Sequence, residues 1–260
     1  MAMNLTAMTT GTGADLVLLH GWGMNNAVWS VILPGLTAEK RVTLIELPGH
    51  GGSLYRDDQR GLDAWVAACL ERAPRRADWI GWSLGGQIAQ RAALMAPERI
   101  RRLMLVCSSP RFIRAHDWPH AMLQQTLHQF ADALKRDHQQ TLIRFLSLQV
   151  KGDDLARETL RLLRQEVAQH PVPDPQALED GLELLLTIDL RAQLNRLQCP
   201  SFWLLGDKDA LVPGSVQQDL LALNIPNAGF QLLKGCAHAP FLSHPAQSLE
   251  SIRRFLGNDE

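Results

Sequence analysis

The segment 81–85 reads Gly-Trp-Ser-Leu-Gly, so that one serine, Ser83, stands between two glycines at a fixed spacing. It follows a short apolar run over 79–82 and precedes a helical pattern over 86–95. At a junction of strand and helix, Gly-x-Ser-x-Gly forms a strained turn that lifts the serine hydroxyl above the edge of a sheet. The pattern predicts that Ser83 is a nucleophile, and a glycine-rich turn without chemistry is the alternative.

A serine hydroxyl is a poor nucleophile at neutral pH and needs a base, which in turn needs an acid to orient it. Where this motif joins a strand to a helix, the acid and then the histidine follow the serine along the chain. Asp207 and Asp209 both follow the apolar run 202–205. We favour Asp209 because its loop must reach over the sheet edge, whereas Asp207, directly after the run, is expected to form a turn.

His238 is the expected base, because it follows the last apolar run and is flanked by small residues that leave its imidazole unobstructed. His244 precedes a proline and is expected to begin the last helix, while His50 is expected to pack a loop. Asp189 fits a helix terminus better than a catalytic acid. We expect polar helix faces to carry the other histidines of this region, which are His116, His120, His128 and His138.

Acyl transfer also needs N–H donors aimed at the oxyanion of the tetrahedral intermediate. The backbone N–H of Leu84, directly after the predicted nucleophile, is one candidate. The other is the N–H of Trp22, which follows the apolar run 16–19 and lies between Gly21 and Gly23. Glycines on both sides permit the tight turn that such a loop requires.

The composition excludes several classes of protein. With 260 residues, 46% hydrophobic and 20% charged, the chain has the balance of a soluble protein with a well-buried core. This excludes a disordered chain, a collagen and a coiled coil. Lys and Arg total 26 against 27 Asp and Glu, so no overall field attracts nucleic acid or an anionic membrane, and we expect neither as a partner.

The cysteine pattern bears on compartment and metal content. The 4 cysteines lie far apart without a Cys-x-x-Cys pair, which favours free thiols in a reducing compartment over disulfides or a zinc site. Residues 1–12 lack the basic start and apolar run of a secretory signal. No apolar stretch reaches the roughly 20 residues that span a bilayer. We therefore expect a cytoplasmic protein without a metal or other cofactor.

Short apolar runs closed by glycine or proline alternate with amphipathic stretches over much of the chain. Runs that are apolar on both faces predict strands buried in a parallel sheet, joined by helices through right-handed crossovers. The predicted helices outside the middle of the chain are 62–72, 86–95 and 248–256. The predicted strands are 16–19, 42–45, 79–82, 103–106, 202–205 and 230–233. The fold class is therefore α/β, with a mostly parallel central sheet and helices on both faces.

The middle of the chain has a different pattern, without strand signals. Asp117, followed by Pro119, is predicted to cap a first helix, after which apolar residues recur at helical spacing. Further helical runs cover 141–149, 154–169 and the stretch after 174–175. About four helices within an α/β chain predict an all-helical cap inserted at about 113–187 into a single domain of residues 1–260.

Taken together, these residues resemble the α/β-hydrolase superfamily, and more narrowly the methyl ester carboxylesterases of biotin synthesis. The resemblance runs from about residue 16 to the end and includes the cap, where unrelated hydrolases diverge most. Beyond the superfamily motifs, the similar stretches are 108–110 with 117–119, 144–146 with 148–149, 181–183 with 189–191, and 237–241 with 243–245. It implies hydrolysis of the methyl ester of pimeloyl-acyl-carrier protein, and of small short-chain esters, with a Ser83, Asp209 and His238 triad.

The resemblance also implies a substrate site and a docking surface for the carrier protein. Substrate would contact Trp22, Ser83, Leu84, His238 and the stretch from Phe145 to Gln149. The acidic carrier would dock on cap arginines that match Arg144, Arg157 and Arg161, whereas Gln140 stands where a further arginine is expected. The helical spacing by itself places Arg157, Arg161 and Arg164 on one face, which also fits an ordinary solvated face.

Two other classes of function remain open at this stage, and we expect a monomer in each case. Related folds carry out thioesterase, lyase or carbon–carbon hydrolase reactions with the same triad. A serine at position 83 argues against dehalogenases and epoxide hydrolases, whose relatives place an aspartate there. A non-catalytic binding protein on this fold is the least favoured reading, because a triad and two oxyanion donors are all present in the sequence.

Overall fold

The computed structural model describes residues 5–56 and 60–257, and within them seven strands form one sheet. Its order is β1-β3-β2-β4-β5-β6-β7, and every neighbouring pair is parallel except β1 with β3. The strands are β1 (Ala7–Thr10), β2 (Ala14–Leu19), β3 (Lys40–Ile45), β4 (Ala77–Trp82), β5 (Ile100–Val106), β6 (Ser201–Gly206) and β7 (Ala228–Leu233). All six predicted strands are confirmed, and the α/β class with them.

Strand β1 was not predicted, and its sequence shows why. Its four residues, Ala-Met-Thr-Thr, are partly or fully exposed, and the strand pairs antiparallel with β3 at the edge of the sheet. In contrast, all six residues of β4 are buried, because helices cover both faces of the sheet there. A continuous apolar run therefore marks a central strand, while a short polar edge strand leaves no such signal.

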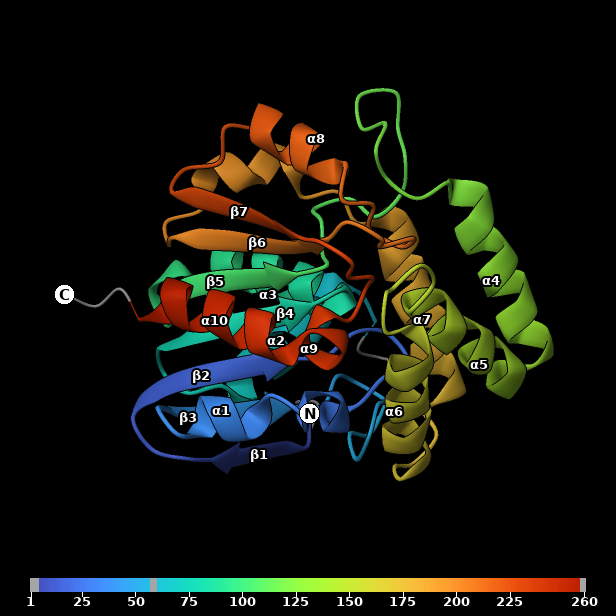
Figure 1. Ribbon diagram of the computed structural model, residues 1–260, viewed down its shortest axis with the longest axis horizontal. Coiled ribbons are helices and arrows are strands. Elements are labelled where there is room, and N and C mark those ends of the chain that lie inside the picture. Colours follow the sequence, from blue (N-terminus) through green and yellow to red (C-terminus); the bar gives the residue numbers. More distant parts are fainter. Residues whose placement is uncertain (1–4, 57–59, 258–260) are drawn as a thin grey trace.

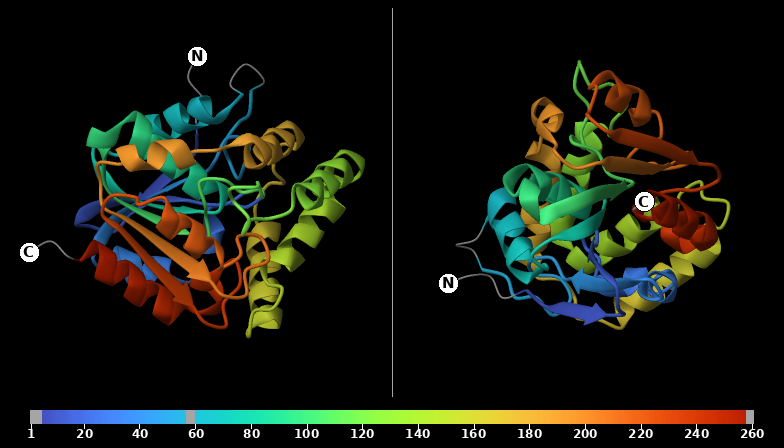
Figure 2. Two further views of the ribbon diagram at one scale, coloured as in Figure 1. Left: turned by 90° about the horizontal axis from the view of Figure 1, so that it is seen from above. Right: turned by 90° about the vertical axis from the view of Figure 1, so that its left-hand side faces the viewer.

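Helices pack on both faces of the sheet, as Figure 2 shows. On one face lie α1 (Leu33–Thr37) and α10 (Pro245–Leu256), packed together where the Leu249 side chain fills the space beside Gly35. On the other face lie α2 (Leu62–Arg72) and α3 (Leu84–Met95). The shorter helices are η1 (Asn26–Trp29), η3 (Pro97–Arg99), η4 (Arg191–Arg196), α8 (Val216–Ala222) and α9 (Pro240–Ser243).

Four helices are inserted between β5 and β6 and lie beyond the carboxyl ends of the strands (Figure 1). They are α4 (Gln124–Arg136), α5 (His138–Gln149), α6 (Ala156–Ala168) and α7 (Pro175–Thr187), which we call the cap. Two of these helices begin at an aspartate whose side chain accepts backbone hydrogen bonds. Asp137 accepts from the N–H of Gln140 at the start of α5, and Asp174 accepts from the N–H groups of Gln176 and Ala177 at the start of α7. Across the described residues, no helix is long and apolar enough to cross a membrane.

The predicted helix start at Asp117 is wrong, because the first cap helix begins at Gln124. Asp117 lies in a turn in which Ala115 and Trp118 exchange backbone hydrogen bonds. Its carboxylate forms an ion pair with Arg191, 3.1 Å away, so it stabilises a long-range contact instead of a helix end. His116 and His120 lie in the same loop and not on helix faces as expected.

Candidate active site

Ser83 occupies the one-residue turn between β4 and α3, with φ 56° and ψ −120°. A residue other than glycine in such a conformation costs about 1–3 kcal/mol and persists only where the surroundings hold it. Here the Ser83 N–H donates to the Val106 carbonyl at 3.0 Å, and the Ser83 carbonyl accepts from the Ser108 hydroxyl at 2.7 Å. The strain is therefore maintained by the neighbouring strand β5 and the loop that follows it.

Two glycines of the motif are required by close backbone contacts. A Cβ at Gly81 would lie 2.4 Å from the Gly85 carbonyl oxygen, and one at Gly85 would lie 2.3 Å from the His20 carbonyl oxygen. Neither backbone oxygen can move away without disturbing a strand or a helix. The spacing Gly-x-Ser-x-Gly thus lets α3 start directly against β2 and β4 and present Ser83 at the sheet edge.

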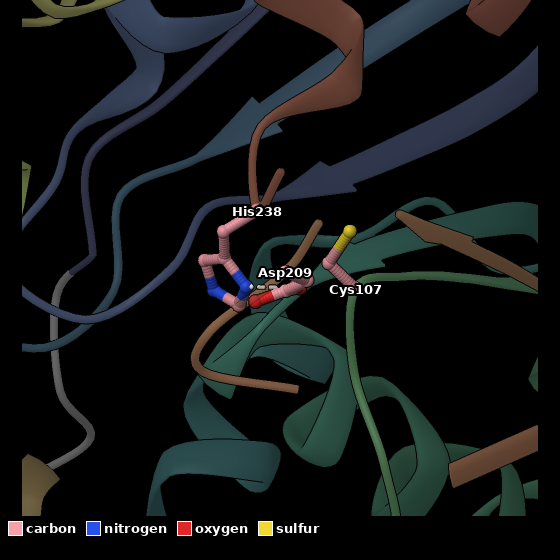
Figure 3. Close-up of side chains that lie close together, drawn as sticks. All are labelled: Cys107, Asp209 and His238. Atoms are coloured by element: carbon pink, nitrogen blue, oxygen red, sulfur yellow. Dashed lines mark hydrogen bonds and ion pairs between the residues drawn. The ribbon is translucent and has the colours of Figure 1, made fainter. Parts of the chain in front are cut away.

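His238 and Asp209 form a buried pair at the carboxyl ends of β6 and β7 (Figure 3). The imidazole Nδ1 lies 2.7 Å from Asp209 Oδ2, and both side chains are 0% exposed. Asp209 Oδ1 accepts from the N–H groups of Leu211 and Val212 at 2.8 and 2.9 Å. The carboxylate is thereby fixed in place, and it holds the Nδ1–H tautomer that leaves Nε2 free to accept a proton.

The alternative acid, Asp207, is located away from the imidazole contact. Its Oδ1 accepts from the Gly235 N–H at 2.8 Å and so holds the turn before His238, as expected for a residue directly after a strand. The two aspartates therefore lie in different positions, and Asp209 is the one in contact with the imidazole.

The histidine is attached to the segment that carries Ser83. The indole Nε1–H of Trp82 donates to the His238 carbonyl at 2.7 Å, and the Trp82 ring centroid lies 5.6 Å from that of the imidazole. His238 Nε2 is buried and has no hydrogen-bond partner among the described residues. A buried nitrogen without a partner is costly unless a substrate or a nearby hydroxyl can reach it, which is the situation of a general base.

The loop that carries Trp22 lies against Ser83. A Cβ at Gly21 would be 3.1 Å from the Ser83 Cβ, and Gly23 has φ 69°, in the region that favours glycine. Neither the Trp22 N–H nor the Leu84 N–H forms a hydrogen bond with a described residue. Leu84 begins α3, so its N–H is one of the free donors at a helix start. Both predicted oxyanion donors are therefore available.

His50 forms a hydrogen bond with this loop, in addition to its predicted role of packing a loop. Its Nε2 accepts from the Gly23 N–H at 3.0 Å, and its Nδ1 bonds the Pro48 carbonyl at 2.8 Å. Burial lowers the pKa of His50 to about 3, so the ring stays neutral and able to accept. His20 lies beside it, with ring centroids 5.4 Å apart, and its Nε2 is 3.1 Å from the Glu46 carboxylate.

Helix α5 of the cap brings Phe145 and Gln149 to the site. Phe145 packs edge-on against Trp22, with ring centroids 4.7 Å apart. The backbone carbonyl of Gln149 accepts a hydrogen bond from the His238 N–H at 2.9 Å. The Gln149 side-chain Oε1 is buried without a partner among the described residues. The cap therefore covers the site closely, and Ser83 is only 2% exposed.

Cys107 lies beside the acid–histidine pair, and sequence reasoning missed it. Its thiol, the carboxylate of Asp209 and the imidazole of His238 come within 4.8 Å of one another, the one group of potential metal ligands in the described part of the chain. Burial, and then the charge of Asp209, raise the pKa of Cys107 well above its ordinary value, so the thiol is neutral. The signal available in the sequence was its position directly after β5, at the edge where the active residues collect.

The three arginines expected to dock a carrier protein lie on the outside of the cap. Arg144 is on α5, while Arg157 and Arg161 are one turn apart on α6, and all three are exposed. Among the described residues, Arg144 and Arg157 have no hydrogen-bond or ion-pair partner, and Arg161 contacts only Gln165, at 3.4 Å. These side chains are therefore available to a negatively charged partner.

Comparisons with known proteins identify the family of the chain. A family model described as the alpha/beta hydrolase fold matches residues 16–245. Among solved structures, an esterase from Exiguobacterium antarcticum has a TM-score of 0.87 at 18% identity, covering 98% of this chain and 96% of the other. A bromoperoxidase from Bacillus anthracis has a TM-score of 0.85 at 23% identity, with the same coverages of 98% and 96%. At such identities these structures show the fold alone.

Relatives of higher identity share a single name. The pimeloyl-[acyl-carrier protein] methyl ester esterase of Photobacterium profundum is 43% identical over 256 residues, which is 98% of this chain and 100% of that protein. The protein of the same name from Nitrosomonas europaea is 43% identical over 240 residues, covering 92% and 94%. The chain therefore belongs to the α/β-hydrolase family, and within it to the family of the pimeloyl-[acyl-carrier protein] methyl ester esterases.

Proposed function

We propose that this protein is a serine carboxylesterase that hydrolyses the methyl ester of pimeloyl-acyl-carrier protein in biotin synthesis, and small short-chain esters as well. The observation that carries the proposal is the buried pair of Asp209 and His238. The imidazole Nε2 of His238 has no partner among the described residues. The His238 carbonyl accepts a hydrogen bond from Trp82, the residue before Ser83. The substrate class is supported by relatives of that name at 43% identity over nearly the whole chain.

In the first half of the reaction, the Ser83 hydroxyl attacks the ester carbonyl while His238 Nε2 takes its proton. Asp209 holds the imidazole through Nδ1–H and stabilises the imidazolium that forms. The carbonyl oxygen becomes an oxyanion, which accepts hydrogen bonds from the N–H groups of Trp22 and Leu84. His238 then donates its proton to the methoxy oxygen, so that methanol leaves and an acyl-enzyme remains.

In the second half, a water molecule takes the place of methanol. His238 accepts a proton from the water, whose oxygen attacks the acyl carbon, and the resulting intermediate collapses to a carboxylic acid as Ser83 regains its proton. The thioester that joins the acyl chain to the carrier protein is not broken. Phe145, Trp22 and Leu84 supply apolar surface for the acyl chain beside the reacting carbonyl.

The carrier protein is the proposed partner, and its docking surface is the outer face of α5 and α6. Arg144, Arg157 and Arg161 are exposed there and available to acidic side chains, and Arg164 lies on α6 as well. Gln140, near the start of α5, offers no charge at the position where a further arginine is expected. We propose that the enzyme acts as a monomer. We also propose that it acts in the cytoplasm, and its four buried free cysteines support this reducing compartment.

The test is turnover of methyl pimeloyl-carrier protein, followed by mass spectrometry of the intact carrier and by assay of methanol. The expected result is loss of one methyl group with the thioester intact, and a decrease of at least about 10³-fold in kcat for Ser83→Ala. Release of free carrier protein would instead identify a thioesterase. Failure of a fluorophosphonate to label Ser83 in the folded protein would revive the non-catalytic reading.

A further inference from the structure

The segment 235–238, which we call the histidine loop, is held through its backbone from two sides. On one side is the loop after β6: the Gly235 N–H donates to Asp207 at 2.8 Å, and the Lys208 N–H donates to the Cys236 carbonyl at 2.9 Å. This side contains the catalytic acid of the proposed triad. The position of the loop therefore depends partly on the same segment that orients the imidazole.

On the other side is the cap, through the segment 149–154 that joins α5 to α6. The His238 N–H donates to the Gln149 carbonyl at 2.9 Å, and the Asp154 N–H donates to the Gly235 carbonyl at 2.9 Å. Between them, the Ala237 N–H donates to Asp153 Oδ2 at 2.8 Å. We call these three cap groups the clasp, and Asp153 is its only side-chain member.

The carboxylate of Asp153 is well suited to this contact. The residue is 7% exposed, and its second oxygen, Oδ1, accepts from the Leu155 N–H at 2.8 Å, at the start of α6. Both oxygens thus accept from backbone N–H donors, and a carboxylate carries only acceptors. An amide could satisfy one of these donors but would direct its NH₂ group at the other. Buried charge-assisted hydrogen bonds of this kind are short and directional.

We infer that Asp153 is a positioning residue for His238: it fixes the peptide immediately before the base and so sets the imidazole relative to Ser83. The inference rests on the proposed function, because it assigns the base role to His238. Its physical reason is that proton transfer requires hydrogen-bond reach, so that a shift of about 1 Å can cost about 100-fold in rate. Because the clasp directly follows α5, the helix that carries Phe145 and Arg144, cap and base are connected through one short segment.

The test compares Asp153→Asn with Glu158→Gln on a small p-nitrophenyl ester that does not need a carrier protein. The control removes the same charge from an exposed side chain in the first turn of α6, outside the clasp. For Asp153→Asn we expect kcat to fall by about 10- to 100-fold with KM within about twofold of the parent. For Glu158→Gln we expect both constants within about twofold.

A second variant separates positioning from the capping of α6. Asp153→Ser keeps a hydroxyl that can accept from the Leu155 N–H two residues on, but it is too short to reach the Ala237 N–H. We expect it to reproduce the fall in kcat. The downfield proton NMR signal of the His238 Nδ1–H should shift in both Asp153 variants and stay in place in Glu158→Gln.

Two outcomes would overturn the inference while leaving the proposed function intact. One is parental kcat in both Asp153 variants, measured well below their melting temperatures. The other is an unchanged Nδ1–H signal in variants whose activity falls. Failure of the proposed function would look different, because the parent protein itself would then not cleave the ester in a Ser83-dependent manner.

Discussion

At the scale of single residues, the arrangement separates the side chains that we propose to react from the side chains that hold them. His238 keeps an unused nitrogen in a buried place, whereas Asp209 and Asp153 have both carboxylate oxygens committed to N–H donors. Committed carboxylates cannot easily change position, because each move would leave a buried donor unpaired. The proposed base and acid therefore lie in a frame of fixed backbone donors, which favours catalysis without reorganisation.

The two aspartates after β6 allow a matched comparison. Asp209→Asn should lower kcat by about 10³- to 10⁴-fold, because an amide cannot hold the Nδ1–H tautomer or stabilise the imidazolium. Asp207→Asn keeps an oxygen that can accept from the Gly235 N–H, so its kcat should fall by less than about tenfold. Steady-state kinetics on a small ester measure both, and equal losses in the two variants would contradict the assignment of the acid.

His50 should make the stability of the protein depend on pH. Its pKa is lowered to about 3 by burial, whereas the unfolded chain has an ordinary value near 6.5. The unfolded state therefore binds a proton first as the pH falls, and stability is lost below pH ~6.5, down towards pH ~3. From pH 7 to pH 5 this group alone should remove about 2 kcal/mol from the free energy of unfolding.

Urea unfolding at pH 7 and pH 5, of the parent and of His50→Gln, measures this effect. The glutamine can still accept the Gly23 N–H but does not titrate, so the variant should lose less stability between the two pH values. Identical losses in the two proteins would show that His50 is not the group that titrates.

At the scale of elements, the junction of β4 with α3 requires the same glycines for its proposed chemistry and for its packing. Ser83 lies at the sheet edge only because the helix starts within one residue of the strand. That early start brings the backbone of α3 so close to β4 and to the end of β2 that no Cβ fits at Gly81 or Gly85. The motif is therefore a packing requirement as much as a catalytic one.

Gly85→Ala should consequently destabilise the fold severely, by more than about 3 kcal/mol, because the added methyl meets backbone that cannot yield. Gly52→Ala is a milder comparison, since its nearest neighbour is the Thr6 hydroxyl oxygen at 3.0 Å. Thermal unfolding of both variants is the measurement. A melting temperature for Gly85→Ala close to that of the parent would contradict this account of the turn.

Helix α6 allows a test of docking that is independent of the chemistry. Reversing charge in Arg157→Glu with Arg161→Glu should raise KM for methyl pimeloyl-carrier protein by about tenfold or more, because like charges then face the acidic partner. Kinetics on a small ester should not change. Arg72→Glu, an exposed position on α2 on the sheet side of the molecule, is the control, and an equal effect there would remove the case for a local surface.

At the scale of the whole molecule, the net charge and the cap both affect how a substrate would reach the site. The net charge is −1, so attraction of an acidic carrier requires a local surface and not an overall field, and we propose the arginines of α5 and α6 as that surface. The cap also covers Ser83 closely, so the proposed docking surface and the cover of the site belong to the same helices.

This predicts a salt dependence that differs between substrates. Raising the ionic strength from about 0.05 M to 0.5 M should raise KM several-fold for the carrier-bound ester, since exposed charges are screened over a shorter distance. KM for a small neutral ester should stay constant. Equal changes for the two substrates would mean that salt acts on the fold and not on docking.

The sequence by itself determined the class of fold, the order of the central strands along the chain and the candidates Ser83, Asp209 and His238. These depend on signals that lie within short segments: apolar runs, a glycine spacing, and the order of motifs along the chain. For the same reason it was wrong about Asp117, whose local cap pattern yields to an ion pair with the distant Arg191.

Only the tertiary structure decided which residues support the site. Asp153 reaches Ala237 across 84 positions of sequence, and His50 reaches Gly23 across 27. Cys107 lies beside Asp209 only because β5 and β6 are neighbours in the sheet. A hydrogen bond between distant segments leaves no local pattern, because its partner is chosen by how strands and helices pack and not by spacing along the chain.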